Sequence, residues 1–226
     1  MSLDIAHSEY WIFDLDNTLY PAECKLFHQV DIRMRNFISD YFNLNEDESV
    51  SLQKRYFREY GTTLNGLMKN HGMKPEAFLE YVHDIDVSVV SPNPSMGLSL
   101  SQLPGQKIVF TNGTLKHAQR VMERLGIEHN FNGVFDIFAT NFTPKPNIEG
   151  YYELVRKFAI NPQKTVMVED MVHNLEPAKN LGMTTVLIKP SFDKHNNGET
   201  KYVDYQVGDL TAWLGKLANL ISVGAK

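Results

Sequence analysis

Two aspartates stand two residues apart directly after a short apolar segment near the start of the chain. Asp14 and Asp16 follow Tyr10–Phe13, whose aromatic and β-branched residues are typical of a buried strand. Two carboxylates about 4 Å apart repel each other by roughly 4 kcal/mol at an effective dielectric constant of ~20. A raised pKa, solvent or a bound cation must offset that repulsion, and Mg²⁺ prefers such oxygen ligands. The pair therefore indicates acid–base or metal-assisted chemistry, with a plain turn or helix cap at Asp16–Thr18 as the alternative.

Other polar residues stand directly after further apolar segments that are typical of buried strands. Parallel strands end at the same edge of a sheet, and open α/β sheets bind their ligands outside that edge. We therefore expect one cleft to hold Asp14, Asp16, Thr111, Asn112, Lys145, Glu169 and Asp170. Singly, these residues have ordinary explanations: Asn112-Gly113 forms turns, Lys145 can be a solvated loop residue, and Glu169-Asp170 can favour a helix start. Their common place after strands favours a functional site.

The segments that must position these residues change in type along the chain. Between about residues 22 and 85, apolar residues recur at helical spacing and no stretch is typical of a strand. Asn45 and Glu48 have the spacing of a helix-capping box, and Gly61 is placed to end that helix. Residues 86–104 form a connector rich in serine and proline. The predicted strands beyond it are 107–111, 134–139, 165–168 and 184–188, and the predicted helices are 114–125, 148–158, 174–181 and 209–221.

Strands that alternate with helices at these spacings pair in parallel through crossover helices. The expected fold is therefore α/β: a doubly wound, Rossmann-like parallel sheet, interrupted after its first strand by an all-helical insertion. We expect residues 1–20 and 96–226 to form the α/β core, and residues 21–95 to form the helical domain with its connector. Residues 190–206 carry no pattern that predicts a helix or a strand.

The composition excludes several classes of protein. The chain of 226 residues has a formal net charge of -5, whereas a general nucleic-acid binder is basic. No apolar run approaches the ~18 residues that span a membrane. The single cysteine, Cys24, permits no internal disulfide and fits a reducing compartment, and His173 has no second histidine or cysteine at the spacing of a zinc site. We expect a cytoplasmic protein, monomeric or weakly dimeric, whose partners are small molecules, with no nucleic-acid polymer and no membrane among them.

In combination, the four polar segments resemble the four motifs of the haloacid dehalogenase-like (HAD) phosphohydrolase superfamily. The matching residues are Asp14-Leu15-Asp16-Asn17-Thr18, Thr111-Asn112-Gly113, Lys145-Pro146 and Glu169-Asp170. Two further segments, Phe13–Pro21 and Tyr60–Leu64, are similar to the pyrimidine 5′-nucleotidase subgroup, whose members carry a helical cap just after the first motif. The helical stretch 22–85 stands at that place in this chain.

The resemblance implies hydrolysis of a phosphate monoester through an aspartyl-phosphate. Asp14 would be the nucleophile and Asp16 the general acid and base, and Lys145 and Thr111 would complete the catalytic set. Mg²⁺ would be held by the Asp14 side chain, the Asp16 backbone carbonyl and the Asp170 side chain. The other implied roles are phosphate binding by Thr111, Asn112, Gly113 and Lys145, a supporting negative charge from Glu169, and contact with the leaving group by Tyr60 and Thr63. Asn174 departs from the pattern, because much of the superfamily has a further acid near this place.

The subgroup resemblance implies a nucleoside 5′-monophosphate, a pyrimidine nucleotide, as the substrate. Other phosphatase substrates remain open, among them a sugar phosphate or pyridoxal phosphate. A sugar phosphomutase uses the same motifs and would move the phosphate within its substrate. A haloacid dehalogenase would also attack with Asp14, but at carbon, and the second acid at Asp16 argues against it. A phosphate-binding module without activity is the non-enzymatic alternative.

Overall fold

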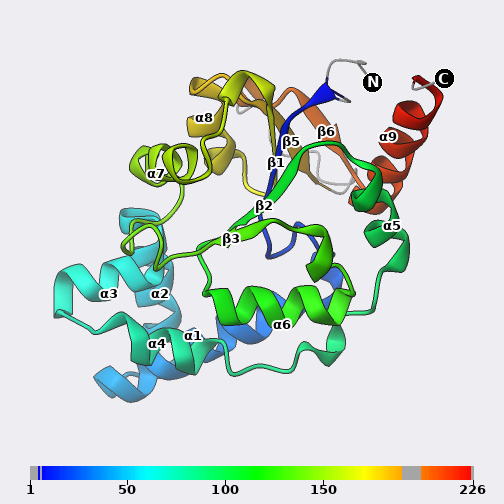
Figure 1. The fold of residues 1–226 in the computed structure, drawn as a ribbon. Helices are drawn as coiled ribbons and strands as arrows, with labels where there is room; N and C mark the ends of the chain where they lie inside the picture. The colour runs from blue at the N-terminus through cyan, green and yellow to red at the C-terminus, as the bar shows by residue number, and fades with distance from the viewer. Residues whose placement is uncertain (1–4, 6, 190–199, 225–226) are drawn as a thin grey trace.

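The computed structural model describes residues 5, 7–189 and 200–224. Within these ranges, six strands form one parallel sheet in the order β3-β2-β1-β4-β5-β6 (Figure 1). The strands are β1 (Tyr10–Phe13), β2 (Gln106–Phe110), β3 (Gly133–Phe135), β4 (Thr165–Glu169), β5 (Thr184–Ile188) and β6 (Tyr205–Val207). The chain moves outward from β1 to β3 and then returns to the other side of β1 at β4, so the expected doubly wound α/β sheet is confirmed.

The register of the central strands brings the predicted functional residues to one level. Phe13 of β1 lies beside Val109 of β2 and Val168 of β4. The backbone N–H of Asp14 donates a hydrogen bond of 2.9 Å to the carbonyl of Val168. The residues that follow these strands therefore emerge at the same edge. The strand order reverses between β1 and β4, which is where open α/β sheets form their ligand crevice.

Helices cover both faces of the sheet and bury two apolar clusters. They are α5 (Pro94–Gln102), α6 (Leu115–Leu125), α7 (Ile148–Phe158), α8 (Val172–Asn180) and α9 (Leu210–Gly224). Side chains alternate along a strand, so Ile12 packs in the cluster with α7 and α8, whereas Trp11 packs in the cluster with α5, α6 and α9. Trp11 meets Trp213 of α9 edge to face, with ring centroids 6.5 Å apart. None of the helices in the described ranges is long and apolar enough to cross a membrane.

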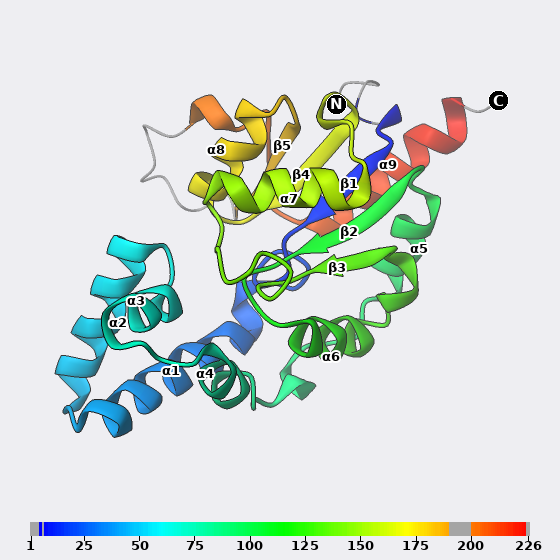
Figure 2. The same cartoon turned by 60° about the vertical axis from the view of Figure 1, so that its left-hand side comes forward.

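Four helices between β1 and β2 form a group set to one side of the sheet (Figures 1 and 2). They are α1 (Leu26–Phe42), α2 (Glu46–Tyr60), α3 (Thr63–His71) and α4 (Pro75–Val82), and we refer to them together as the helical insertion. The predicted capping box is present, because Asn45 Oδ1 accepts the Glu48 N–H over 3.0 Å and Glu48 Oε2 accepts the Asn45 N–H over 2.9 Å. Gly61 ends α2 with a φ of 80°, a conformation that glycine adopts without strain.

The segment that leaves the helical insertion, residues 83–90, is bonded to α6. Arg120 donates to the carbonyls of His83 and Ile85 over 2.8 and 2.7 Å. Arg124, one turn further along α6, donates to the carbonyls of Val90 and Ser88 over 2.7 and 3.1 Å. Because both arginines stand on α6, this exit segment is held against the core of the molecule.

Several sequence predictions need correction. The connector 86–104 contains α5. This helix begins where the Asn93 side chain accepts a hydrogen bond from the N–H of Met96, and it packs against α9. Because of its serines, it was not predicted as a helix. The strand predicted over 134–139 ends at Phe135, because the Asp136 carboxylate accepts the backbone N–H groups of Leu115 and Ala139. Strand β6 was not predicted. Of the unassigned stretch 190–206, residues 190–199 lie outside the described residues.

Short 3₁₀ helices occupy Ala22–Cys24, Val87–Val89, Glu128–Asn130, Pro162–Lys164 and Thr200–Tyr202.

Gly105, just before β2, is expected to tolerate no side chain. Its φ is 76°, and a Cβ built there would stand 2.1 Å from the carbonyl oxygen of Glu9, which belongs to backbone. Gly105→Ala should therefore lower the free energy of unfolding by more than about 2 kcal/mol, measured by urea denaturation. Gly72→Ala is the matched control, because Gly72 has a φ of 61° with no atom within 4 Å of the built Cβ. Equal losses from both variants would contradict the steric argument.

Candidate active site

One cavity of about 180 Å³ lies where the ends of β1, β2 and β4 face the helical insertion. The polar residues predicted from the sequence motifs all line it: Asp14, Asp16, Thr111, Asn112, Gly113, Lys145, Glu169 and Asp170. Thr63 lines it as well, whereas Tyr60 is not among its lining residues. Tyr60 lines a neighbouring pocket and donates a hydrogen bond of 3.2 Å to Asn70 Oδ1 within the insertion.

Lys145 joins two carboxylates at the centre of this cavity. Its Nζ lies 2.7 Å from Asp14 Oδ1, 2.7 Å from Glu169 Oε1 and 2.9 Å from the Phe110 carbonyl, and only 2 % of the residue is exposed. Burial by itself lowers the pKa of the Lys145 ammonium, but the charges of Asp14 and Glu169 outweigh it and hold the pKa above its usual value. The ammonium group is therefore a permanent positive charge beside Asp14.

Asn112 and Asn174 hold this arrangement in place. The Asn112 Oδ1 accepts the Lys145 backbone N–H over 2.8 Å, and its Nδ2 donates to the Lys145 carbonyl over 3.3 Å. Asn174 Nδ2 donates to Glu169 Oε1 over 2.7 Å, and the Met171 N–H donates to Glu169 Oε2 over 2.8 Å. Where an acid was expected, Asn174 thus supplies a donor that fixes Glu169.

The turn after β1 folds a hydroxyl back onto Asp14. Asn17 has a φ of 59°, a left-handed conformation that asparagine tolerates better than most residues. The Thr18 hydroxyl donates to Asp14 Oδ2 over 3.0 Å, so both oxygens of Asp14 have a donor. Directly after β2, the Thr111 hydroxyl oxygen accepts the Gly113 N–H over 2.9 Å. Both threonines are nearly fully buried, and Thr111 lines the cavity.

Three carboxylates gather close enough to share one cation. Asp14, Glu169 and Asp170 each offer an oxygen, and these oxygens lie within 4.8 Å of one another. Burial is the main cause that raises the pKa of Asp14 to about 7 and that of Asp170 to about 9; the neighbouring carboxylates add to this rise, and the Lys145 charge opposes it. Groups that resist ionisation in this way are stabilised as anions by a divalent cation, and an all-oxygen set suits Mg²⁺. The residues present therefore fit Mg²⁺, with Asp14 and Asp170 as the predicted side-chain ligands.

We expect the stabilising effect of Mg²⁺ to grow with pH. The unfolded chain releases the protons of Asp14 and Asp170 near pH 3.8, whereas the folded chain keeps them up to about 7 and 9. In chelator, the free energy of unfolding should therefore fall as pH rises through this window. Thermal unfolding should show a larger Mg²⁺-induced rise in Tm at about pH 8.5 than at about pH 6. Asp170→Asn should reduce that rise, and an equal Mg²⁺ effect at both pH values would contradict the assignment.

Asp16 is held by two side chains to which the sequence analysis gave no role. Its Oδ1 accepts the Tyr20 hydroxyl over 2.6 Å and lies 2.9 Å from His117 Nε2. Burial raises the pKa of the Asp16 carboxyl, but His117 and Tyr20 outweigh it and bring the pKa below its ordinary value. His117 stands one turn into the helix that follows Thr111–Gly113, and this closeness to a motif was the signal available in the sequence.

Comparisons with known proteins identify a family and several relatives. Residues 11–188 match the family described as haloacid dehalogenase-like hydrolase. Over 136 residues the chain is 30% identical to Phosphate metabolism protein 8 of Saccharomyces cerevisiae, a match that covers 55% of this chain and 42% of that protein. Over 192 residues it is 27% identical to the glyceraldehyde 3-phosphate phosphatase of Methanothermobacter thermautotrophicus, covering 78% of this chain and 83% of that one.

A solved structure with the same fold is that of CbbY from Rhodobacter sphaeroides in complex with phosphate. It superposes with a TM-score of 0.64 at 14% sequence identity, covering 93% of this chain and 96% of that one. At an identity this low, the likeness shows only that the fold is shared. The chain thus spans less than half of the yeast relative but most of the archaeal phosphatase and of the solved structure.

Proposed function

Because the chain belongs to the haloacid dehalogenase-like hydrolase family, we propose that it is a Mg²⁺-dependent phosphate-monoester hydrolase that acts through an aspartyl-phosphate. The observation that carries this proposal is the Lys145 ammonium, held between Asp14 and Glu169 beside Asp170. A dianionic phosphate can approach the Asp14 carboxylate only where positive charge offsets the repulsion. The phosphatase among the relatives supports the same activity.

In the proposed reaction, the residues of the cavity catalyse two successive displacements at phosphorus. The Asp14 carboxylate attacks phosphorus, and the bond to the leaving oxygen breaks as Asp16 gives that oxygen a proton. Water then attacks the aspartyl-phosphate, Asp16 takes a proton from it, and Asp14 is regenerated as inorganic phosphate leaves. Lys145 stays charged throughout, and Thr111, Asn112 and Gly113 hydrogen-bond the phosphate oxygens. Asp14, Asp170 and the Asp16 carbonyl would hold Mg²⁺, which would supply positive charge to offset that of the phosphate.

The helical insertion serves in this proposal as the cap that contacts the leaving group. None of the described residues that the insertion contributes to the cavity lining is an acid, a lysine or an arginine. His83, at the start of the exit segment, also lines the cavity, and burial lowers its pKa to about 3, so its ring is neutral. The lining residues of the insertion are Phe27, Val30, Met34, Phe57, Thr62, Thr63, Leu64, Phe78, Leu79 and Val82. Such a surface suits a monophosphate with an uncharged leaving group. Since α5 packs against α9, we place the end of the cap domain before α5 rather than at residue 95.

A more specific hypothesis is that the substrate is a pyrimidine nucleoside 5′-monophosphate. This hypothesis rests on the resemblance of Phe13–Pro21 and Tyr60–Leu64 to the subgroup. The aromatic side chains of Phe57 and Phe78 in the lining are compatible with a base. Sugar phosphates and pyridoxal phosphate are the competing substrates. A substrate with a second phosphate is disfavoured, because the described residues of the insertion that line this cavity include no lysine or arginine.

The test is a panel of phosphate monoesters assayed for inorganic phosphate with and without Mg²⁺. It contains UMP, CMP, purine monophosphates, sugar monophosphates, a sugar bisphosphate and pyridoxal phosphate. We expect phosphate release that depends on Mg²⁺, with the highest kcat/KM values for UMP and CMP. The kcat/KM for the sugar bisphosphate should be at least about tenfold lower than that for the matching monophosphate. Product formation without phosphate release would indicate a mutase, and no turnover of any monoester would contradict the proposed function.

A further inference from the structure

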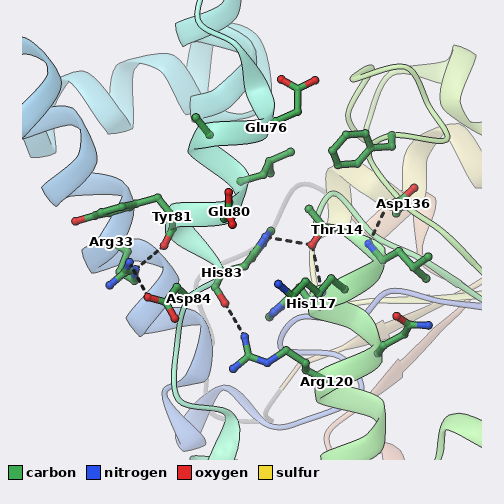
Figure 3. A pocket seen from close by; sticks show the side chains of 16 residues that line it. Arg33, Glu76, Glu80, Tyr81, His83, Asp84, Thr114, His117, Arg120 and Asp136 are labelled. Atoms are coloured by element: carbon green, nitrogen blue, oxygen red, sulfur yellow. Dashed lines mark hydrogen bonds and ion pairs between the residues drawn. The ribbon is translucent and has the colours of Figure 1, made fainter.

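A pair of histidines lies where the helical insertion meets α6. The His117 ring on α6 is 1 % exposed, and its Nε2 faces Asp16. His83, the residue that ends α4, stacks on this ring with centroids 4.5 Å apart and planes 12° apart (Figure 3). Neither histidine belongs to the motifs identified in the sequence, and the two-step reaction described above gives neither of them a role.

The surroundings of His117 settle which nitrogen carries its proton. Nδ1 is buried and has no hydrogen-bond partner within the described part of the chain. A proton on Nδ1 would therefore be a buried donor without an acceptor, which is costly. Nε2, in contrast, lies 2.9 Å from a carboxylate oxygen of Asp16. The ring therefore presents an N–H at Nε2, which donates a hydrogen bond to Asp16 Oδ1.

Both donors to Asp16 converge on the same oxygen. Tyr20 and His117 reach Oδ1 over 2.6 and 2.9 Å, whereas no described residue donates a hydrogen bond to Oδ2. Two fixed donors on Oδ1 restrict rotation of the carboxyl group. They leave Oδ2 as the oxygen that can hold a proton and exchange it with a substrate in the cavity that Asp16 lines.

His83 in turn restricts the His117 ring, and its own place is set by α6. Its carbonyl accepts from Arg120 over 2.8 Å, and its Nδ1 lies 3.4 Å from the Thr114 hydroxyl (Figure 3). Residues Thr114, His117 and Arg120 stand at three-residue spacing and so share one side of the helix. The stacked ring of His83 covers one face of His117 and prevents it from tilting away from Asp16.

On the basis of the proposed phosphatase function, we propose that His117 is a positioning residue, held by His83, that orients Asp16 so that Oδ2 delivers the proton to the leaving oxygen. The proton moves from Asp16 Oδ2 to the leaving oxygen as its bond to phosphorus breaks, and it is replaced from the attacking water in the second displacement. His117 keeps its own proton on Nε2 throughout.

The test compares two leaving groups of similar size. p-Nitrophenolate leaves without protonation, whereas phenolate is more basic and needs a proton. For His117→Ala we expect kcat/KM to fall about 10²-fold with phenyl phosphate and to stay within about threefold of wild type with p-nitrophenyl phosphate. His117→Gln, whose amide can donate to Asp16, should recover most of the loss. His83→Ala should give the same pattern with a smaller loss, and the exposed His129→Ala should change neither substrate.

Equal losses with both substrates, or no loss, would overturn the positioning role. If His117→Ala does not fold, as judged by Tm, Tyr20→Phe removes the other donor to Oδ1 and must give the same substrate-dependent loss. Failure of the proposed function would appear separately, in the wild-type protein, as no phosphate release from either ester.

Discussion

Replacing Asp14 by asparagine should abolish turnover while the protein stays folded. The amide has the shape of the carboxylate but cannot attack phosphorus, so phosphate release should fall by at least about 10⁴-fold. The fold should survive, because Lys145 retains its ion pair with Glu169 and its bond to the Phe110 carbonyl. The measurements are phosphate release with a generic aryl phosphate and the Tm of the variant.

The matched control for this variant is Asp84→Asn. Asp84 has a side chain that is 81% exposed and pairs with Arg33, so neither turnover nor stability should change appreciably. Asp14→Asn should also reduce the Mg²⁺-induced rise in Tm, because it removes one of the three clustered carboxylates. Turnover by Asp14→Asn at the rate of the wild type would rule out this residue as the nucleophile.

Replacing Lys145 by methionine should damage both activity and stability. Without the ammonium, the buried carboxylates of Asp14 and Glu169 repel each other with no positive charge between them. Removal of one partner from a buried ion pair costs about 3–5 kcal/mol, and the loss should be larger at alkaline pH, above the raised pKa of Asp14. Phosphate release should fall by about 10³-fold, because the incoming phosphate loses its fixed cation.

Lys107→Met provides a control for the burial of a lysine as such. Lys107 is only 6 % exposed, but its Nζ donates to the carbonyls of Leu103 and Gly105 and pairs with no carboxylate among the described residues. Its loss should cost stability without a strong pH dependence and should leave the turnover of the folded protein intact. Urea denaturation at two pH values, with and without Mg²⁺, separates the two lysines. A Lys145→Met variant that matches the Lys107→Met variant in all these measurements would contradict the charge argument.

The parts of the fold with a repeating signal were predictable. Strand β1 and helix α7 were predicted at their observed bounds, because aromatic and β-branched runs and three- to four-residue apolar spacing are local patterns. Parallel pairing then brings the ends of β1, β3 and β4 to the same edge of the sheet, so the cluster of Asp14, Lys145 and Asp170 followed from order along the chain. The three-residue strand β6 has too few residues to carry a pattern, and it exists because β5 offers it a partner.

The bonds made across the site were not predictable in the same way. Lys145 was identified as a charge near Asp14, but its contact with the Phe110 carbonyl depends on how a loop closes. His117 is a lone histidine in an amphipathic helix, a residue type that sequence alone cannot separate from an ordinary core position. Its partner Asp16 is 101 positions away in the chain, and only the folded sheet brings the two together.

The exit segment of the helical insertion has a consequence for how this protein can diverge. Arg120 and Arg124 bond to the backbone carbonyls of residues 83–90 and not to their side chains. Every amino acid has a backbone carbonyl, so many positions of this segment can be substituted without loss of its hydrogen bonds to α6. The two arginines have no such freedom, since lysine lacks the forked donors. Among descendants of this gene, substitutions should therefore accumulate in residues 83–90, whose carbonyls accept the hydrogen bonds, and be rare at Arg120 and Arg124, which donate them.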